Sequence, residues 1–422
     1  MKVDLNIDLH HLTRVEGHGN IHVQVKDGKI KQARWDVVET PRYFEVMLKG
    51  KHYTSAGILT ARICGICSIG HCLASLRATE QAFGINITNK AAQLRLLAKH
   101  GETLQSHILH LFFLAAPDFL KVPSAIPLLD SHPDIVAAGL RLKALGNRIC
   151  EVVGGRATHP VSLLVGGVAR MPEGLDDLQY DLESAQDDLA AAAELFGTFD
   201  IPEFQRETEF VSLKGEEEYP WIGGRLVSSD GVDKAEHEYT VMTNEEVVEN
   251  NTSKWCKLSR ESFAVGALAR FNNNHHLLHP QALEVATGLG LKPVCHNPFM
   301  NNVAQLVECV HVVHDAMRLV DALQGSDSEP TLVPVTPKAG EGISAVEVPR
   351  GILYHHYRYD EKGYITKANC VIPTTQNNAN IHHTLRDLVA ANAREGMTSE
   401  QLELLCSMLV RAYDPCVSCS VH

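Results

Sequence analysis

The sequence has no long hydrophobic run and no surplus of positive charge. None of its apolar segments reaches the roughly 20 residues that a membrane-spanning helix needs, and candidates such as Leu109–Ala116 are far shorter. Lysine and arginine number 38 against 51 aspartates and glutamates, so the formal net charge is −13. Nucleic acid and anionic membranes repel a chain this acidic. We therefore expect neither a membrane span nor a nucleic-acid partner.

The sequence also lacks the features of a secreted, disulfide-bonded protein. It has 11 cysteines, an odd number, and most of them stand alone, which does not match a disulfide framework. Residues 1–19 are acidic and polar, unlike a secretory signal, although a protein carried across a membrane by its partner would lack a signal as well. Unpaired thiols are typical of a reducing compartment, where they stay available to metals. We expect a cytoplasmic protein.

The hydrophobic pattern predicts an α+β fold that is mainly α. Between residues 62 and 196, apolar side chains recur at the spacing of long helices that pack as a bundle. One such stripe consists of Leu94, Leu97, Leu104, Ile108 and Leu111. Alternating residues at 21–25, an Asp27-Gly28 turn and a return over 30–38 predict a β-hairpin. A second hairpin is expected at 351–372, followed by two helices.

We expect one large domain over residues 1–422, with a long-helix bundle as its core and β-hairpins at its periphery. A chain of this length can bury a cofactor. The expected parts are an N-terminal β region (1–55), a helical bundle (56–200) and a β and loop subdomain (201–255). The last part (256–422) contains helices, a β-hairpin and a C-terminal metal-binding segment.

Two Cys-x-x-Cys pairs lie at opposite ends of the chain: Cys64 with Cys67, and Cys416 with Cys419. Such a turn points both sulfurs at one place, so each pair offers half of a four-thiolate site. A structural zinc site, a thioredoxin-like dithiol and a redox metal site all use this motif. No βαβ pattern surrounds either pair, which disfavours the dithiol. Zinc pairs usually lie close together in sequence, whereas here a whole domain separates them, which favours a buried redox metal.

Longer motifs surround both pairs. Residues 62–71 read Arg-x-Cys-Gly-x-Cys-x-x-x-His, and residues 414–422 read Asp-Pro-Cys-x-x-Cys-x-x-His. Together these motifs resemble the two signatures of the large, catalytic subunit of NiFe-hydrogenases, and the resemblance runs nearly from end to end. Further matching segments lie at residues 14–18, 39–45, 154–160, 265–270, 349–351 and 373–377.

The resemblance implies that all four cysteines bind nickel. Cys67 and Cys419 would also bridge to an iron that carries carbonyl and two cyanides, while Cys64 and Cys416 would be terminal ligands. Soft thiolate sulfur favours nickel and eases changes of its oxidation state. The implied reaction is the reversible, heterolytic cleavage of H2 to protons and electrons. The Cys416 thiolate would take the proton, and Glu16 would pass it outward.

Four other residues match positions around that centre. Arg350 would lie over the iron side, where its guanidinium stabilises the cyanides. Thr374 would donate a hydrogen bond to a cyanide, and His71 would donate to a bridging sulfur. Asp414 would orient Arg350 or a nearby water. Ordinary alternatives exist for most of these residues: a surface position for Glu16 and Arg350, a core histidine for His71, and a turn cap for Asp414.

A second metal, Mg²⁺ or Fe²⁺, is implied near the C-terminus. Its ligands would be Glu39, the backbone carbonyl of Cys370 and His422. The alternative for Glu39 is a solvated carboxylate on a strand.

Three positions depart from the pattern of many family members. Ser106 stands where an aspartate is common, so the hydrogen bonding around Arg350 would differ. Val348 stands in place of an alanine and Gln376 in place of a tryptophan. These departures resemble the cytoplasmic multimeric class, which includes sulfhydrogenases and the F420-non-reducing and NAD(P)-linked enzymes, more than the membrane-bound uptake class.

The resemblance also implies partners. The chain has no further cysteine motif and hence no iron–sulfur cluster of its own, so electrons would leave through an obligate iron–sulfur small subunit. Further electron-transfer subunits would select the acceptor. The family's large subunit is made with a C-terminal extension that a protease removes after nickel insertion. We expect a chain ending at His422 to be the mature form, and nickel-insertion proteins and a maturation protease to be partners.

Two functions from other classes compete with this interpretation. One is a non-catalytic, hydrogenase-like structural subunit of a quinone module, which lacks the thiolate quartet. The other is a zinc-stabilised scaffold, which would bind zinc alone.

Overall fold

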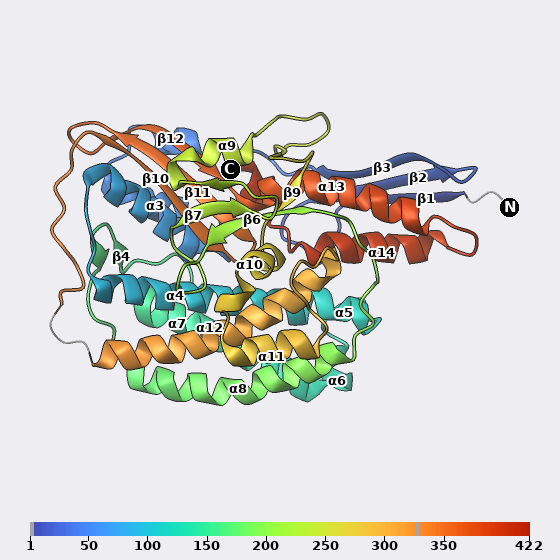
Figure 1. The fold of residues 1–422 in the computed structure, drawn as a ribbon, viewed down its shortest axis with the longest axis horizontal. Coiled ribbons are helices and arrows are strands. Elements are labelled where there is room, and N and C mark those ends of the chain that lie inside the picture. Colours follow the sequence, from blue (N-terminus) through green and yellow to red (C-terminus); the bar gives the residue numbers. More distant parts are fainter. Residues whose placement is uncertain (1–3, 326–328) are drawn as a thin grey trace.

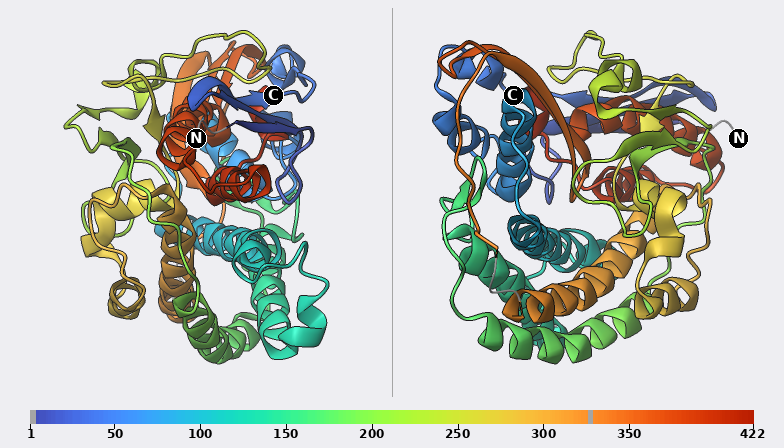
Figure 2. Two further views of the ribbon diagram at one scale, coloured as in Figure 1. Left: turned by 90° about the vertical axis from the view of Figure 1, so that its right-hand side faces the viewer. Right: turned by 60° about the vertical axis from the view of Figure 1, so that its left-hand side comes forward.

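Four long helices form a bundle on one side of the computed structural model, which describes residues 4–325 and 329–422. They are α4 (Asn89–Ile108), α7 (Pro133–Gly154), α8 (Leu175–Gly197) and α12 (Asn301–Gln324), which lie side by side in Figures 1 and 2. Their facing sides enclose an extended hydrophobic core of leucine, valine and alanine side chains. The predicted helical bundle is confirmed.

Local sequence explains how α4 begins and why it packs closely. Thr88 caps its first turn by accepting a hydrogen bond from the backbone N–H of Ala91 at 3.1 Å. Where α4 meets α7, a Cβ on Gly101 would lie 2.8 Å from the carbonyl oxygen of Gly146. Glycine at this position therefore lets the two helix backbones approach each other directly.

A three-stranded antiparallel sheet contains the first predicted hairpin. Its order is β1 (Leu5–Leu9), β2 (Gly19–Lys26), β3 (Lys29–Val37). The β2–β3 turn is the predicted Asp27-Gly28, with φ angles of 54° and 72° that suit a two-residue hairpin loop. The strand β1 lies in the expected N-terminal β region (1–55), but it was not singled out, because five residues give only a brief alternating pattern.

The second predicted hairpin belongs to another three-stranded sheet, of order β10 (Gly340–Val348), β11 (Gly351–Tyr359), β12 (Ile365–Val371). β11 and β12 form the predicted hairpin. The strand β10 was not predicted, because its second half is buried on both faces and so does not alternate. α3 (Ser68–Phe83) packs along β10 and β11, as Figure 1 shows. The packing brings the start of α3 to the β10–β11 turn.

The remaining elements are mostly short. A four-stranded sheet of order β8-β7-β6-β9 and a two-stranded β4-β5 sheet lie in the middle of the sequence. Their strands are β4 (Leu163–Leu164), β5 (Gly167–Val168), β6 (Glu209–Lys214), β7 (Arg225–Ser228), β8 (Asp233–Lys234) and β9 (Phe263–Ala264). The other helices are α1 (Phe44–Leu48), α2 (Tyr53–Thr60), the π-helix η1 (Leu109–Ala115), α5 (Ala116–Phe119), α6 (Leu128–Ser131), η2 (Glu236–Glu238), α9 (Tyr239–Thr243), α10 (Ala267–Asn274), η3 (His275–Leu277), α11 (Pro280–Gly288), η4 (Pro298–Met300), α13 (Pro373–Asn392), α14 (Ser399–Ala412) and η5 (Ser418–Val421).

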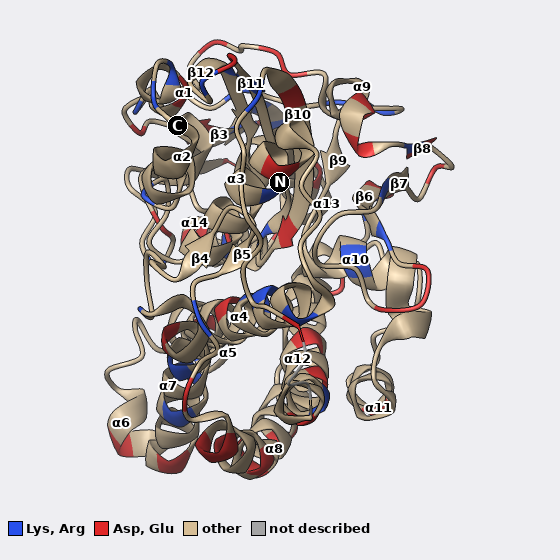
Figure 3. Cartoon of the chain, turned by 90° about the vertical axis from the view of Figure 1, so that its left-hand side faces the viewer, with Lys and Arg blue, Asp and Glu red and all other residues tan. Residues whose placement is uncertain are grey.

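The charged residues are spread over the surface, and acidic ones gather along α8 (Figure 3). Among residues 4–325 and 329–422, no helix combines the length and the apolar character needed to cross a membrane.

Candidate metal centre

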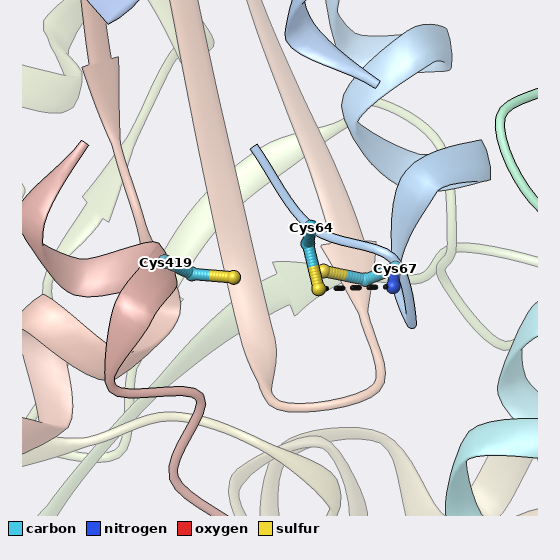
Figure 4. Close-up of side chains that lie close together, drawn as sticks. All are labelled: Cys64, Cys67 and Cys419. Carbon is cyan, nitrogen blue, oxygen red and sulfur yellow. Dashed lines mark hydrogen bonds between the residues drawn. The ribbon is translucent and has the colours of Figure 1, made fainter. Parts of the chain in front are cut away.

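The two Cys-x-x-Cys pairs meet inside the protein. Cys64 and Cys67 lie in the turn that leads into α3, Cys416 lies just before η5, and Cys419 lies within η5. The Sγ atoms of Cys64, Cys67 and Cys419 are all within 4.8 Å of one another, and Figure 4 shows them pointing toward a common space. The Sγ atom of Cys416 lies 3.6 Å from that of Cys64 and 2.7 Å from that of Cys419.

The four cysteines fit a soft transition metal. Two thiolates bound at about 2.3 Å to one tetrahedral ion would lie about 3.8 Å apart. The 3.6 Å between Cys64 and Cys416 is close to this separation, whereas the 2.7 Å between Cys416 and Cys419 is shorter than it, so a bound ion would move these two sulfurs apart. No more than 5% of any of these four residues is exposed, and all four are free thiols. Several buried thiolates need a cation to compensate their charge, and soft sulfur donors favour a transition metal over Mg²⁺ or Ca²⁺.

The backbone around the first pair favours a thiolate. The N–H groups of Ile66 and Cys67 both donate to Cys64 Sγ at 3.3 Å, and the positive end of the α3 dipole follows directly. Contacts with the thiols of Cys416, Cys419 and Cys67 hold the pKa of Cys64 well below its ordinary value. Burial and the neighbouring sulfurs raise the pKa of Cys419 well above its ordinary value. The group thus favours one thiolate by itself, and a cation would be needed to deprotonate the rest.

Glu16 lies against the second pair. Its Oε2 accepts hydrogen bonds from the Cys416 thiol at 3.2 Å and the Ser418 N–H at 3.0 Å, and its Oε1 accepts from the Ser418 hydroxyl. The Val417 N–H donates to the Glu16 carbonyl oxygen at 2.9 Å, which fixes the two segments side by side. Gly17 has a φ of 83°, and a Cβ there would lie 2.8 Å from the Ser418 nitrogen. This glycine therefore permits the close approach that brings Glu16 to Cys416.

Arg350 and Asp414 form a buried ion pair. Arg350 donates through Nη2 to Asp414 Oδ1 at 2.7 Å, through Nε to the Asp414 carbonyl at 2.6 Å, and through Nη1 to Ser106 Oγ at 3.4 Å. Burial acts to lower the pKa of Arg350, but Asp414 and the cysteine sulfurs raise it well above its ordinary value. The guanidinium is therefore charged. Ser106 contributes a neutral hydroxyl to it, as its departure from the family pattern predicts.

A buried ionic network holds the turn that carries Arg350. Arg270, in α10, donates to the carbonyl oxygens of the two residues before Arg350 at 3.0 and 3.1 Å. Its guanidinium also binds Glu308 at 2.6 and 2.7 Å and Glu347 at 2.9 Å. Burial acts to raise the pKa of Glu308, but Arg270 outweighs it and holds that pKa far below its ordinary value. Arg270 ends the matching segment 265–270, but the sequence alone assigned it no role.

Thr374 and His71 lie near the cysteines as well. Thr374 Oγ1 accepts from the Cys416 N–H at 3.0 Å, so its hydroxyl hydrogen remains available to a further acceptor. His71 Nδ1 lies 3.3 Å from Nε2 of His355, and burial lowers the pKa of His71 to about 4, so its ring is neutral. His71 Nε2 is buried without a hydrogen-bond partner in the part of the chain that the structure describes. Its expected hydrogen bond to a bridging sulfur of the metal centre therefore stays a prediction.

His422 and Cys370 meet near the C-terminus, but the predicted ligand Glu39 does not join them. His422 Nε2 lies 2.6 Å from the Cys370 carbonyl oxygen. The carboxylate beside them is that of Glu45, whose Oε1 accepts from the Cys370 N–H at 2.8 Å and lies 3.7 Å from His422 Nε2. Glu39 instead contacts the N–H and Nδ1 of His18 at 3.0 and 2.8 Å. The reason is that α1, which carries Glu45, packs against β12, which carries Cys370.

The sequence could have indicated Glu45 as a ligand, because this residue ends the matching segment 39–45. Burial acts to raise the pKa of Glu45, but hydrogen bonds with His422 and the Cys370 N–H outweigh it and place the pKa below its ordinary value. An ionised carboxylate, an imidazole and a carbonyl oxygen suit Mg²⁺ or Fe²⁺. Arg42, from the same segment, donates to one carbonyl from each cysteine-bearing segment, both at 2.6 Å, and so ties them together.

Comparisons with known proteins show the family of the chain. A family model described as nickel-dependent hydrogenase matches residues 42–133 and 217–422, and one described as HoxL-like matches residues 6–40. The alpha subunit of sulfhydrogenase 2 from Pyrococcus furiosus is 33% identical, and the match covers 99% of this chain and 98% of that protein. The beta subunit of the NAD-reducing hydrogenase HoxS from Cupriavidus necator is 30% identical, with 97% and 93% covered. A solved NAD⁺-reducing NiFe-hydrogenase in its H2-reduced state has a TM-score of 0.89 and 26% identity, with both chains covered completely.

Proposed function

The chain belongs to the nickel-dependent hydrogenase family, and we infer that it is the catalytic large subunit of a NiFe-hydrogenase of the multimeric class. It cleaves H2 reversibly and heterolytically to protons and electrons. The observation that carries this function is the convergence of four buried thiols from opposite ends of the chain. This quartet argues against a structural subunit of a quinone module, which lacks the four thiolates.

We propose that Cys64, Cys67, Cys416 and Cys419 would hold nickel together with an iron that carries carbonyl and two cyanides. When bound, this group would supply the chemistry that splits H2 and would pass on the electrons. The protein excludes water from the group, because the four residues are almost fully buried. A dry site strengthens every electrostatic interaction within it.

The protein supplies the base for heterolytic cleavage. The Cys416 thiolate takes up the proton on Sγ, and Glu16 Oε2, at 3.2 Å, accepts it from there. Two hydrogen bonds from Ser418 keep the Glu16 carboxylate facing the sulfur. The carboxylate then carries the proton away from the metals.

Arg350 supplies a fixed positive charge next to the thiolates. A guanidinium does not lose its proton in the working pH range, so it stabilises the thiolates and the anionic cyanides throughout the reaction. Asp414 aligns Arg350 by accepting two of its hydrogen bonds. The free hydroxyl hydrogen of Thr374 would donate to a cyanide, and the unpaired Nε2 of His71 is available to the ligands of the centre.

We also propose that Glu45, the Cys370 carbonyl and His422 hold Mg²⁺ or Fe²⁺, with Glu45 in place of the predicted Glu39. His422 Nδ1 lies 3.1 Å from the carbonyl oxygen of Cys419. A cation at this place would therefore fix the segment that carries Cys419 against β12.

We propose that an iron–sulfur small subunit is an obligate partner, and that further subunits select the electron acceptor. Within the described residues, no second cluster of cysteines has the spacing of an iron–sulfur site, so the electrons need another carrier. The free state of all 11 cysteines supports a cytoplasmic location. Because the quartet is buried, the metals have to enter before the C-terminal segment closes, which supports nickel-insertion and maturation proteins as partners.

The variant Cys416→Ser tests this function in the purified complex. We expect it to lose H2 evolution and H2/D2O isotope exchange, because an alcohol neither binds nickel like a thiolate nor takes the proton. The matched control is Cys295→Ser, which changes a half-buried thiol outside the quartet and should leave both activities intact. Full H2 evolution by Cys416→Ser would contradict the proposed function.

A further inference from the structure

The segments that carry Glu16 and Cys416 are joined a second time, away from the sulfurs. Asp118, in α5, accepts from Arg411 Nη1 at 2.9 and 2.8 Å and also from the guanidinium of Arg14. Arg411 donates through Nε to the carbonyl oxygen just before Arg14 at 3.0 Å. The Asp118 side chain is 3% exposed and that of Arg411 is 6% exposed. One buried carboxylate therefore links the segment just before Glu16 with the segment just before Cys416.

The π-helix η1 directly precedes α5, the helix that carries Asp118. The carbonyl oxygen of Leu114, in η1, accepts from Arg14 Nη1 at 2.7 Å. The ring of His110, also in η1, lies 2.7 Å through Nε2 from the carbonyl oxygen of Arg411. π-Helices are rare and often occur at functional sites. Together η1 and α5 present a carbonyl, an imidazole and a carboxylate to the two arginine-bearing segments.

The backbone is strained at the same position in both segments, two residues before Glu16 and two residues before Cys416. Arg14 and Asp414, each two residues before Glu16 and Cys416 respectively, have φ angles of 59° and 49°. Left-handed backbone costs a non-glycine residue free energy and persists only where surrounding contacts fix it. The ion pairs of Arg14 and Arg411 supply such contacts beside both turns.

We propose that Asp118 is a positioning residue that sets the separation between the Glu16 carboxylate and the Cys416 thiol. It acts through Arg14 and Arg411. This inference rests on the proposed function, in which the S–H bond of Cys416 breaks and its proton joins Oε2 of Glu16. Proton transfer needs the donor and acceptor atoms within hydrogen-bond reach. The observed 3.2 Å between Cys416 Sγ and Glu16 Oε2 is such a contact, and a displacement of about 1 Å would break it.

The variant Asp118→Asn tests the inference in the purified, nickel-containing complex. The amide loses the negative charge that both guanidinium groups share, so the two segments separate. We expect H2/D2O isotope exchange to fall about 10²-fold, as for a displacement of about 1 Å, while the nickel content stays unchanged. We also expect the backbone N–H of Val417, which donates to the Glu16 carbonyl, to exchange its hydrogen about tenfold faster. Unchanged exchange at Val417 would overturn the inference.

A double variant separates positioning from a general loss of stability. In a Glu16→Gln background, Asp118→Asn should lower the residual activity by at most about twofold, because both changes act on one step. Losses that multiply independently would contradict a role through Glu16. The matched control is Glu80→Gln, which removes another buried carboxylate, paired with Arg95, and should alter neither the isotope exchange nor Val417.

A milder variant keeps the test decisive if Asp118→Asn does not fold. Arg14→Gln removes only the ion pair between Asp118 and Arg14, whose side chain is 14% exposed, and keeps the pair between Asp118 and Arg411. It should also speed amide exchange at Val417. If Glu16→Gln by itself retains full isotope exchange, the proposed proton route fails, and the amide exchange of Val417 still decides whether Asp118 holds the two segments together.

Discussion

The thiol of Cys416 donates to Glu16 Oε2 across 3.2 Å, although the two residues are 400 positions apart in the sequence. Their backbones meet in an isolated parallel bridge, so the contact does not depend on side-chain rotamers alone. A thiol and a carboxylate are ordinary groups separately. Held together beside the buried cysteines, they form the proposed route for a proton. The two ends of the chain thus make one functional unit.

The variant Glu16→Gln should interrupt this route. Glutamine has the size of glutamate but does not accept the proton, so we expect H2 oxidation and H2/D2O exchange to fall about 10²–10⁴-fold. Elemental analysis should show unchanged nickel and iron. Glu39→Gln, whose carboxylate contacts His18 instead, is the matched control and should keep full activity. Wild-type exchange in Glu16→Gln would remove this residue from the proton route.

The variant Arg350→Lys should keep the charge and lose the geometry. Lysine makes a single contact where the guanidinium reaches both the side chain and the carbonyl of Asp414. We expect turnover to fall about 10²–10³-fold, with a shifted infrared absorption of the cyanide ligands. Arg358→Lys, on an exposed part of β11, should change neither. Normal turnover together with an unshifted cyanide absorption would show that the guanidinium does not act on the centre.

The proposed second metal site makes opposite predictions for two glutamates in one segment. Glu45→Gln should lower the Mg²⁺ content, or the iron content beyond one atom per chain, because it removes the only charged ligand. It should also speed amide exchange at the segment carrying Cys419, which His422 contacts. Glu39→Gln should do neither. The reverse pattern in elemental analysis would restore Glu39 as the ligand.

Removing Arg270 should destabilise the whole protein. Arg270→Met leaves the buried carboxylates of Glu308 and Glu347 without their cation, which typically costs about 3–5 kcal/mol. A denaturant titration followed by tryptophan fluorescence would show a lower midpoint. Arg141→Met, which breaks an exposed ion pair with Asp188, should leave the midpoint nearly unchanged. Equal midpoints for both variants would show that the buried network contributes no net stability.

Features set by local sequence could be predicted, and features set by long-range packing could not. The Asp27-Gly28 turn follows from residues that tolerate positive φ, and the long helices follow from apolar periodicity. The strand β10 was not predicted because its second half is buried on both faces, and one of the side chains buried there is the carboxylate of Glu347. That carboxylate accepts hydrogen bonds from Arg270, 77 positions away in sequence, and from the Leu213 N–H, contacts that the sequence pattern does not reveal.

The same distinction applies to the site. The four cysteines stand in specific motifs, so their convergence could be predicted. The choice between Glu39 and Glu45 could not, because it depends on the direction of α1 after the left-handed turn at Tyr43, where φ is 56°. Asp118 gave no signal, since its partner Arg411 lies 293 positions away and a lone aspartate in an apolar segment has no motif.

Nickel-edge X-ray absorption of the purified complex, combined with elemental analysis, tests most directly whether the four thiols hold the catalytic metals. We expect about one nickel per chain, coordinated by sulfur at roughly the thiolate distance of 2.3 Å, together with iron. The sulfur signal should diminish in Cys64→Ser and remain in Cys295→Ser. Zinc without nickel, or nickel coordinated only by nitrogen and oxygen, would contradict a nickel–iron centre at Cys64, Cys67, Cys416 and Cys419.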